Sequence, residues 1–266
     1  MGLVAKSQRS TWGWLRLIIL ILALIVVAMN AWLSQLRSTD WDRPLWVVIY
    51  PINADQGADT QLYVDALLEG HFDDIEHFMA REARHYDLPL ETPLEVYLAP
   101  PLIEHPPKPP HNPSMLDSVL WSLNLRYWAW QNDSWTGSTP DIKVYLKLHS
   151  PKTHQVLEHS LGLQKGMIGV VNGFASVDYQ AQNNFVTIHE VLHTLGATDK
   201  YDLSNNQPIW PDGYADPELE PLLPQAYAEV MGGRIPRTST TAEMPENLEQ
   251  VLVGEKTAQE INWVQP

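Results

Sequence analysis

The chain has 266 residues, 44% of them hydrophobic, with a formal net charge of −15 and no cysteine. So acidic a surface disfavours binding to nucleic acid or anionic lipid, and the lack of cysteine excludes disulfides and thiol chemistry. A chain of this length can bury a core without such cross-links.

The N-terminal part carries a membrane-anchoring pattern. Thirteen apolar residues run without interruption from Leu17 to Met29, and the run continues to Leu33 with Asn30 as its one polar residue. Basic residues precede it, namely Lys6, Arg9 and Arg16. This flank predicts a single-pass signal anchor, a transmembrane helix at 17–33, with residues 1–16 in the cytoplasm. Because no A-x-A site follows, we expect the anchor to stay uncleaved, with a cleaved signal peptide as the alternative.

The rest of the chain is expected on the outer side of the membrane, periplasmic or extracellular. Residues 34–44 form a short linker, and residues 45–266 form one folded domain. All 32 acidic residues lie from Asp40 onward, whereas four of the 17 basic residues precede it. The outer domain is therefore strongly acidic. Because it has no disulfides to rely on, we expect a bacterial source.

Hydrophobic periodicity predicts a mixed α/β (α+β) domain. Leu45–Tyr50 forms a buried strand that Pro51 ends, and Ala58–His85 is largely helical. A second strand, Leu94–Leu98, leads into a proline-rich segment at 100–110, which we interpret as a stiff surface loop.

The second half of the domain is predicted in the same way. Met115–Gln131 forms a helix whose three tryptophans pack into the core, and strands follow at Ile142–Leu148 and Met167–Val171. Residues 203–226 are rich in Pro, Asn, Asp and Gly and form a loop. A closing helix at Leu248–Trp263 completes the domain. The tryptophans are Trp121, Trp128 and Trp130.

The segment His189-Glu190-Val191-Leu192-His193 carries the main functional signal. On a helix, histidines four residues apart project from one face, so both imidazoles can reach one zinc ion. Glu190 lies close enough to take a proton from a water molecule on that ion. Asn183-Asn184 caps the start of the helix. Its stripe facing the core consists of Ile188, Leu192 and Leu195.

Gly196 ends this helix, because glycine readily adopts the left-handed conformation of a sharp turn. The turn swings Asp199 back toward the metal as the third ligand. Asp202 is further along the chain, and we interpret it as a capping or outer carboxylate. Three protein ligands and one water make a catalytic zinc site, so we expect one zinc ion per chain.

The pattern HExxHxxGxxD at 189–199 resembles that of the metzincin zinc peptidases, whose third metal ligand is usually histidine. An aspartate at the position of that third ligand, here Asp199, is similar to the snapalysin branch. Metzincins also carry a tight turn with a methionine beneath the metal, and Ala228–Gly233, which contains Met231, is similar to it. The resemblance covers 185–202 and 227–233. It implies a metzincin-like zincin domain with a mixed sheet and an active-site helix.

The resemblance also implies how substrate is held. The strand that precedes the active-site helix, here Met167–Val171, forms the rim of the cleft and pairs with an extended substrate. No tyrosine follows Met231 at the spacing of some metzincin branches. Tyr201 and Tyr227 are the candidates for a tyrosine that stabilises the transition state instead.

These features predict a membrane-anchored zinc endopeptidase that acts on protein or peptide substrates, with Glu190 as general base. A gluzincin-like hydrolase, with a glutamate as third ligand, is one alternative, but Gly196 argues against it. A hydrolase of cell-wall amide bonds is another. A non-catalytic, membrane-tethered binding protein is the third, and the intact Glu190 argues against it. The candidate gluzincin-like ligands are Glu218, Glu220 and Glu229.

Overall fold

A computed structural model of the chain describes residues 13–19, 21–22, 39–111 and 114–265. In these ranges the largest sheet has five strands in the order β2-β1-β3-β5-β4. The first four in this order are parallel, and β4 is antiparallel to β5. The domain is therefore mixed α/β, as predicted. The strands are β1 (Leu45–Asn53), β2 (Leu94–Leu98), β3 (Ile142–His149), β4 (Leu161–Leu163) and β5 (Ile168–Phe174).

The first strand runs further than predicted. Pro51 does not end β1, which continues to Asn53 and pairs with β3 over this stretch. The Pro51 carbonyl accepts a hydrogen bond from the Leu102 amide, on the side of β1 where β2 has already ended. Proline is tolerated at this position because the sheet requires no backbone N–H donor there.

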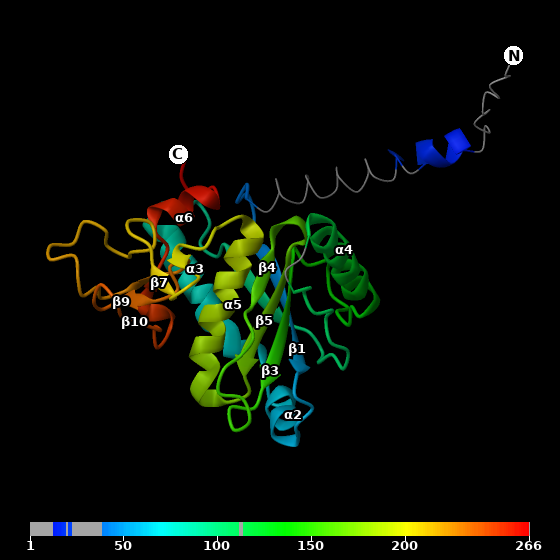
Figure 1. Ribbon diagram of the computed structural model, residues 1–266, viewed down its shortest axis with the longest axis horizontal. Helices are drawn as coiled ribbons and strands as arrows, with labels where there is room; N and C mark the ends of the chain where they lie inside the picture. The colour runs from blue at the N-terminus through cyan, green and yellow to red at the C-terminus, as the bar shows by residue number, and fades with distance from the viewer. Residues whose placement is uncertain (1–12, 20, 23–38, 112–113, 266) are drawn as a thin grey trace, which may run out of the picture.

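Helices cover both faces of the sheet (Figure 1). Helices α3 (Asp73–His85) and α5 (Gln180–Leu195) pack on one face, and α4 (Met115–Gln131) packs on the other. Residues that alternate along β1 enter two separate hydrophobic clusters, one on each face. This is the pattern of a parallel sheet that is buried on both sides.

The helix predicted at Ala58–His85 is divided into α2 (Ala58–Asp65) and α3 by a 3-10 turn at Glu69–Phe72. The turn buries the Phe72 ring and leaves the His71 carbonyl free to accept hydrogen bonds from two side chains of α5. A continuous helix would have used that carbonyl internally, so tertiary contacts explain the break.

The chain after α5 is largely irregular. It contains short strand pairs, and the predicted helix at Leu248–Trp263 is wrong: only α6 (Glu255–Glu260) is α-helical there. Val251–Leu252 instead forms β11, which pairs with β8 (Ala228–Glu229). The other short strands are β6 (Tyr201–Asp202), β7 (Gln207–Pro208), β9 (Ile235–Pro236) and β10 (Ala242–Glu243).

The rim of the sheet also differs from the expectation. The predicted rim strand at Met167–Val171 is β5, which has β3 on one side and β4 on the other. The edge strand is β4, which packs closely against α5 because Gly162 has no side chain: a Cβ there would meet the Glu190 carbonyl and the His193 Cβ. The short β4, not β5, therefore forms this edge of the sheet.

The predicted anchor at 17–33 falls mostly outside the described residues. Residues 13–19 and 21–22 are helical. In the parts of the chain that the structure describes, no helix is long and apolar enough to cross a membrane. Trp41, within the predicted linker, is buried and donates a hydrogen bond to the Ile261 carbonyl, so the packed domain begins before Leu45.

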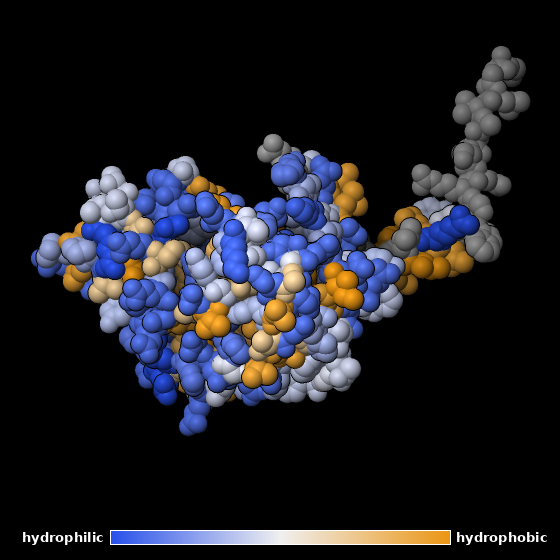
Figure 2. Space-filling view, turned by 90° about the horizontal axis from the view of Figure 1, so that it is seen from below, coloured by the Kyte–Doolittle hydropathy of each residue, from blue (hydrophilic) through white to orange (hydrophobic). Residues whose placement is uncertain are grey.

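The surface seen in Figure 2 is mostly hydrophilic, in keeping with the acidic composition. Apolar side chains are scattered over this face among the hydrophilic ones (Figure 2). Two tryptophans of α4, Trp121 and Trp128, pack against the sheet as predicted, whereas Trp130 is 73% exposed and the prediction for it is wrong.

The close approach of β4 to α5 gives a first prediction. We expect Gly162→Ala to destabilise the domain by about 1–3 kcal/mol, because the new methyl group overpacks against α5. Gly169→Ala is the matched control, since its Cβ would lie in ordinary contact, 3.6 Å from the nearest Val144 methyl carbon. Urea unfolding followed by tryptophan fluorescence measures both, and equal midpoints for the two variants would contradict the packing described.

Candidate metal centre and active site

Helix α5 carries the two histidines of the HExxH segment. Their rings lie 4.7 Å apart on one side of the helix, and Ile188, Leu192 and Leu195 are buried in the core on another, as predicted.

The predicted start of α5 is wrong, because the helix begins at Gln180. Asn183 and Asn184 lie inside it, and their buried side chains bind backbone groups of Phe174 and His71.

Both imidazoles are oriented by backbone carbonyls. Nδ1 of His189 lies 2.9 Å from the Val230 carbonyl oxygen, and Nδ1 of His193 lies 2.8 Å from that of Ala197. A protonated Nδ1 donates to a carbonyl, which leaves Nε2 as the atom that faces the site. This arrangement fixes the ring orientation and the tautomer that a metal ligand requires.

Asp199 completes the cluster. Gly196 ends α5 with a φ of 111°, as predicted, and the chain folds back. Oδ1 of Asp199 lies 3.2 Å from Nε2 of His189 and 3.1 Å from Nε2 of His193. Of the residues described, these three form the one group of His, Cys, Asp and Glu that could hold a metal ion.

The electrostatics of the cluster follow from this geometry. Burial alone would raise the pKa of Asp199, but the hydrogen bonds with both histidines hold it well below its usual range. Burial alone would lower the pKa of His189, yet the hydrogen bond to Asp199 and the charge of Glu190 raise it. The site therefore favours the ionised form of the Asp199 carboxyl and the protonated form of the His189 imidazole beside it.

Glu190 stands beside the cluster. It is 5% exposed, and its Oε2 atom has no hydrogen-bond partner among the described residues. Burial raises the pKa of this carboxyl. A buried carboxylate oxygen without a partner is costly, and such groups concentrate at functional sites.

A polar clamp holds the loop that carries Asp199. The Glu260 carboxylate accepts hydrogen bonds from the amide and hydroxyl of Thr198 and from the buried Lys200 ammonium. The Lys200 amide also donates to the Met231 carbonyl. Sequence analysis missed Lys200 and Glu260, which lie 60 residues apart and carry no local signal.

Met231 lies fully buried in a tight turn close to the cluster, in which Gly233 has a φ of 74°. The Glu229 carboxylate, also fully buried, accepts hydrogen bonds from the amides of Met231 and Gly232 and from two groups of the C-terminal segment. Burial raises the pKa of Glu229, and these donors oppose the rise. The turn thus holds Val230, whose carbonyl orients His189.

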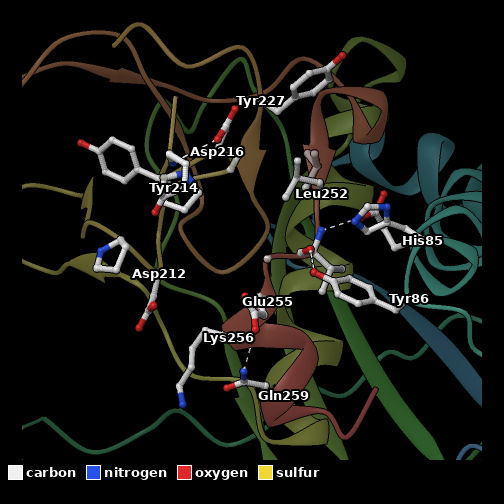
Figure 3. Close-up of a pocket in the computed structure, with 18 of the residues that line it drawn as sticks. His85, Tyr86, Asp212, Tyr214, Asp216, Tyr227, Leu252, Glu255, Lys256 and Gln259 are labelled. Atoms are coloured by element: carbon white, nitrogen blue, oxygen red, sulfur yellow. Dashed lines mark hydrogen bonds between the residues drawn. The ribbon is translucent and has the colours of Figure 1, made fainter. Parts of the chain in front are cut away.

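The two candidate tyrosines lie in different places. The Tyr201 ring centroid is 6.3 Å from that of His189, and burial together with the charge of Asp199 raises the pKa of Tyr201 to about 12. Tyr227 instead lines a separate cavity of about 990 Å³ (Figure 3). His85 and Tyr86 line the same cavity, opposite Tyr214 and Asp212 in this view. Only Tyr201 adjoins the metal-ligand cluster.

A cleft of about 430 Å³ adjoins the cluster at His189. His189, Glu190 and Tyr201 line it together with residues that sequence analysis did not select. Their positions on a helix face and in distant loops gave no sequence signal. They include Phe185, Val186, Asn206, Arg234 and Met244.

The carboxylates that could replace Asp199 as a ligand lie elsewhere. Asp202 accepts hydrogen bonds from the amide and hydroxyl of Ser204, as expected of a capping residue. Glu218 lines the larger cavity, and Glu229 is occupied by its four donors. None of them belongs to the described metal-ligand cluster.

Comparison with known protein families and with curated proteins finds no match for this chain. The assignment of a function therefore depends on the geometry of the site.

The buried Glu229 carboxylate gives a second prediction. Glu229→Gln should lower the free energy of unfolding by about 1–3 kcal/mol. The NH₂ group of the new side chain cannot accept the hydrogen bonds that a carboxylate oxygen of Glu229 accepts. Glu218→Gln, on the exposed loop, is the matched control and should leave stability unchanged. Chemical denaturation distinguishes them. A Glu229→Gln domain as stable as the control would show that the buried carboxylate does not hold the turn.

Proposed function

We propose that the protein is a zinc-dependent endopeptidase of metzincin-like architecture. The observation that carries this proposal is the convergence of two carbonyl-oriented histidines and Asp199 beside Glu190, a buried carboxyl with an unpartnered oxygen. The parallel sheet with an antiparallel edge strand, the Gly196 turn and the buried Met231 turn support it.

The donor set suits zinc. Ligand atoms of a tetrahedral zinc site, with bonds of about 2.0–2.2 Å, lie roughly 3.4 Å apart. The two distances between histidine Nε2 and Asp199 Oδ1, 3.2 and 3.1 Å, are close to this value. Two imidazoles and one carboxylate are ligands that zinc accepts in catalytic sites, where a fourth position stays open. We expect one zinc ion per chain.

The chemistry divides among few residues. Zinc, when bound, supplies Lewis-acid polarisation of a carbonyl and lowers the pKa of a water molecule. Glu190 accepts the proton of the attacking water and passes it to the leaving amine. Its burial supports this role, because the raised pKa makes the carboxylate a stronger proton acceptor. Tyr201 lines the same cleft, and we assign to its hydroxyl group the role of donor to the developing oxyanion.

The edge strand supports a peptide substrate. Among the described strands, β4 pairs only with β5, so its outer edge offers backbone groups to an extended chain. The cleft beside it is lined by Phe185, Val186 and Met244, which suit an apolar side chain. A hydrolase of another amide, such as a cell-wall bond, would use the same centre and is the second substrate class that the site could serve.

A gluzincin-like hydrolase and a non-catalytic binding protein have less support. A gluzincin-like site requires a glutamate ligand, and none of the three candidates is in the cluster of described residues. A binding protein without activity has no use for Glu190 beside the ligands. The apolar run at 17–33 supports a single-pass membrane anchor, with the domain on the periplasmic or extracellular side.

The general base can be tested directly. Glu190→Ala should keep the fold and the zinc but lower the rate of peptide hydrolysis by about 10²–10⁴-fold, as expected when a general base is removed. Hydrolysis of a diverse peptide mixture, read by mass spectrometry, measures the rate, and metal analysis measures the zinc. Glu218→Gln serves as the control with unchanged activity. Wild-type hydrolysis by Glu190→Ala would refute the mechanism.

The third ligand can be tested separately. Asp199→Ala should weaken zinc binding sharply, because it removes one of three protein ligands, whereas Asp199→His should restore it. Asp202→Asn, three residues further on, should bind zinc like the unmodified protein. Competition with a zinc chelator gives the affinities. Normal zinc retention by Asp199→Ala combined with loss in Glu229→Gln would favour the gluzincin-like hydrolase.

A further inference from the structure

Helix α4 is apolar on both sides. Its inner side packs Leu125 and Ala129 into the hydrophobic cluster on one face of the sheet, with Trp121 and Trp128 beside them. Its outer side carries large apolar residues that nothing in the described structure covers. These residues, which we call the outer stripe, are Met115, Leu116, Val119, Leu120, Leu123, Tyr127 and Trp130.

The outer stripe is continuous along the helix. At about 100° per residue, its members fall within an arc of roughly 140°, so they form one surface over the whole length of α4. Exposure ranges from 49% for Leu123 to 87% for Met115. No member is charged, and the nearest cation, Arg126, is turned partly inward against Gly166. An exposed apolar surface of this kind marks a contact site.

The position of α4 relates the stripe to the N-terminal apolar run. The segment that follows the helix carries Asp141, which pairs with Arg43 and accepts a hydrogen bond from the Trp46 amide. This segment, 132–141, therefore links the C-terminal end of α4 to the point where the chain enters β1. The apolar run ends only a short distance before that point in the sequence.

We propose that the outer stripe of α4 lies on the lipid surface of the membrane that holds the N-terminal anchor. This inference rests on the proposed anchor and is independent of the proposed catalysis. A short connection keeps the domain at the bilayer, and Tyr and Trp are the aromatic residues that prefer the interface. Because the stripe is uncharged and the domain acidic, the contact depends on apolar insertion and suits neutral lipid.

A second copy of the chain fits the stripe less well. Two copies carry the same formal net charge of −15 and repel one another. The stripe is a single convex helix surface about 25 Å long, which suits insertion into lipid better than packing against a second convex helix.

The contact would orient the active site. Helix α5 and the metal-ligand cluster lie on the other face of the sheet from α4. With the stripe on lipid, the sheet lies between the bilayer and the cleft, so the cleft opens to the aqueous phase. The substrate class is then a soluble or flexible peptide segment outside the membrane, rather than a transmembrane helix.

The absence of native cysteine permits a sharp test, because a single introduced cysteine can be labelled uniquely. The full chain carrying Leu123→Cys or Val119→Cys, with an environment-sensitive fluorophore, is reconstituted into phosphatidylcholine vesicles that contain a nitroxide-labelled lipid. Leu62→Cys is the matched control, since Leu62 is 70% exposed on α2, which packs with α3 on the other face. We expect severalfold stronger quenching at 123 and 119 than at 62.

The outcomes separate the proposals. Equal quenching at 123 and 62 in a chain that floats with the vesicles would overturn the lipid contact and leave the anchor intact. A chain that does not float with the vesicles would overturn both. A second change, Leu120→Glu in the Leu123→Cys chain, should reduce quenching, and unchanged quenching would also contradict the contact. Peptide hydrolysis is measured independently of all three results.

Discussion

The irregular C-terminal third of the domain depends on one buried carboxylate. Glu229 is fully buried and accepts hydrogen bonds from two amides of the Met231 turn and from Gly254 and Thr257 near α6. A buried charge is tolerated only when donors surround it, so this group constrains the turn and the closing segment together. The same turn holds the Val230 carbonyl against His189.

The metal-ligand cluster combines a rigid part with an assembled one. The histidines stand on α5, whose apolar stripe is locked in the core, whereas Asp199 stands on a loop that Lys200 and Glu260 hold. Each ligand is thus oriented by contacts that do not themselves face the site. Such support keeps ligands within the narrow geometry that metal binding requires.

The two faces of the sheet serve different purposes. The face covered by α3 and α5 carries the cleft and the ligands, and α3 presents charged side chains to solvent. The face covered by α4 carries no such cluster in the described residues, but it presents the outer stripe. A sheet that is buried on both sides keeps the cleft and the outer stripe apart in this way, because the helices on its two faces do not contact each other.

Sequence alone determined the features that depend on local periodicity: most of the strands of the sheet, the helix at Met115–Gln131, the HExxH histidines, the Gly196 turn and the return of Asp199. Spacing on a helix and the conformational freedom of glycine suffice for these. Only the tertiary structure decided the start of α5, the edge position of β4, the irregular segment before α6 and the clamp between Lys200 and Glu260. Each of these depends on contacts between residues distant in the chain, where a buried polar group finds its partner, and such pairing has no local pattern.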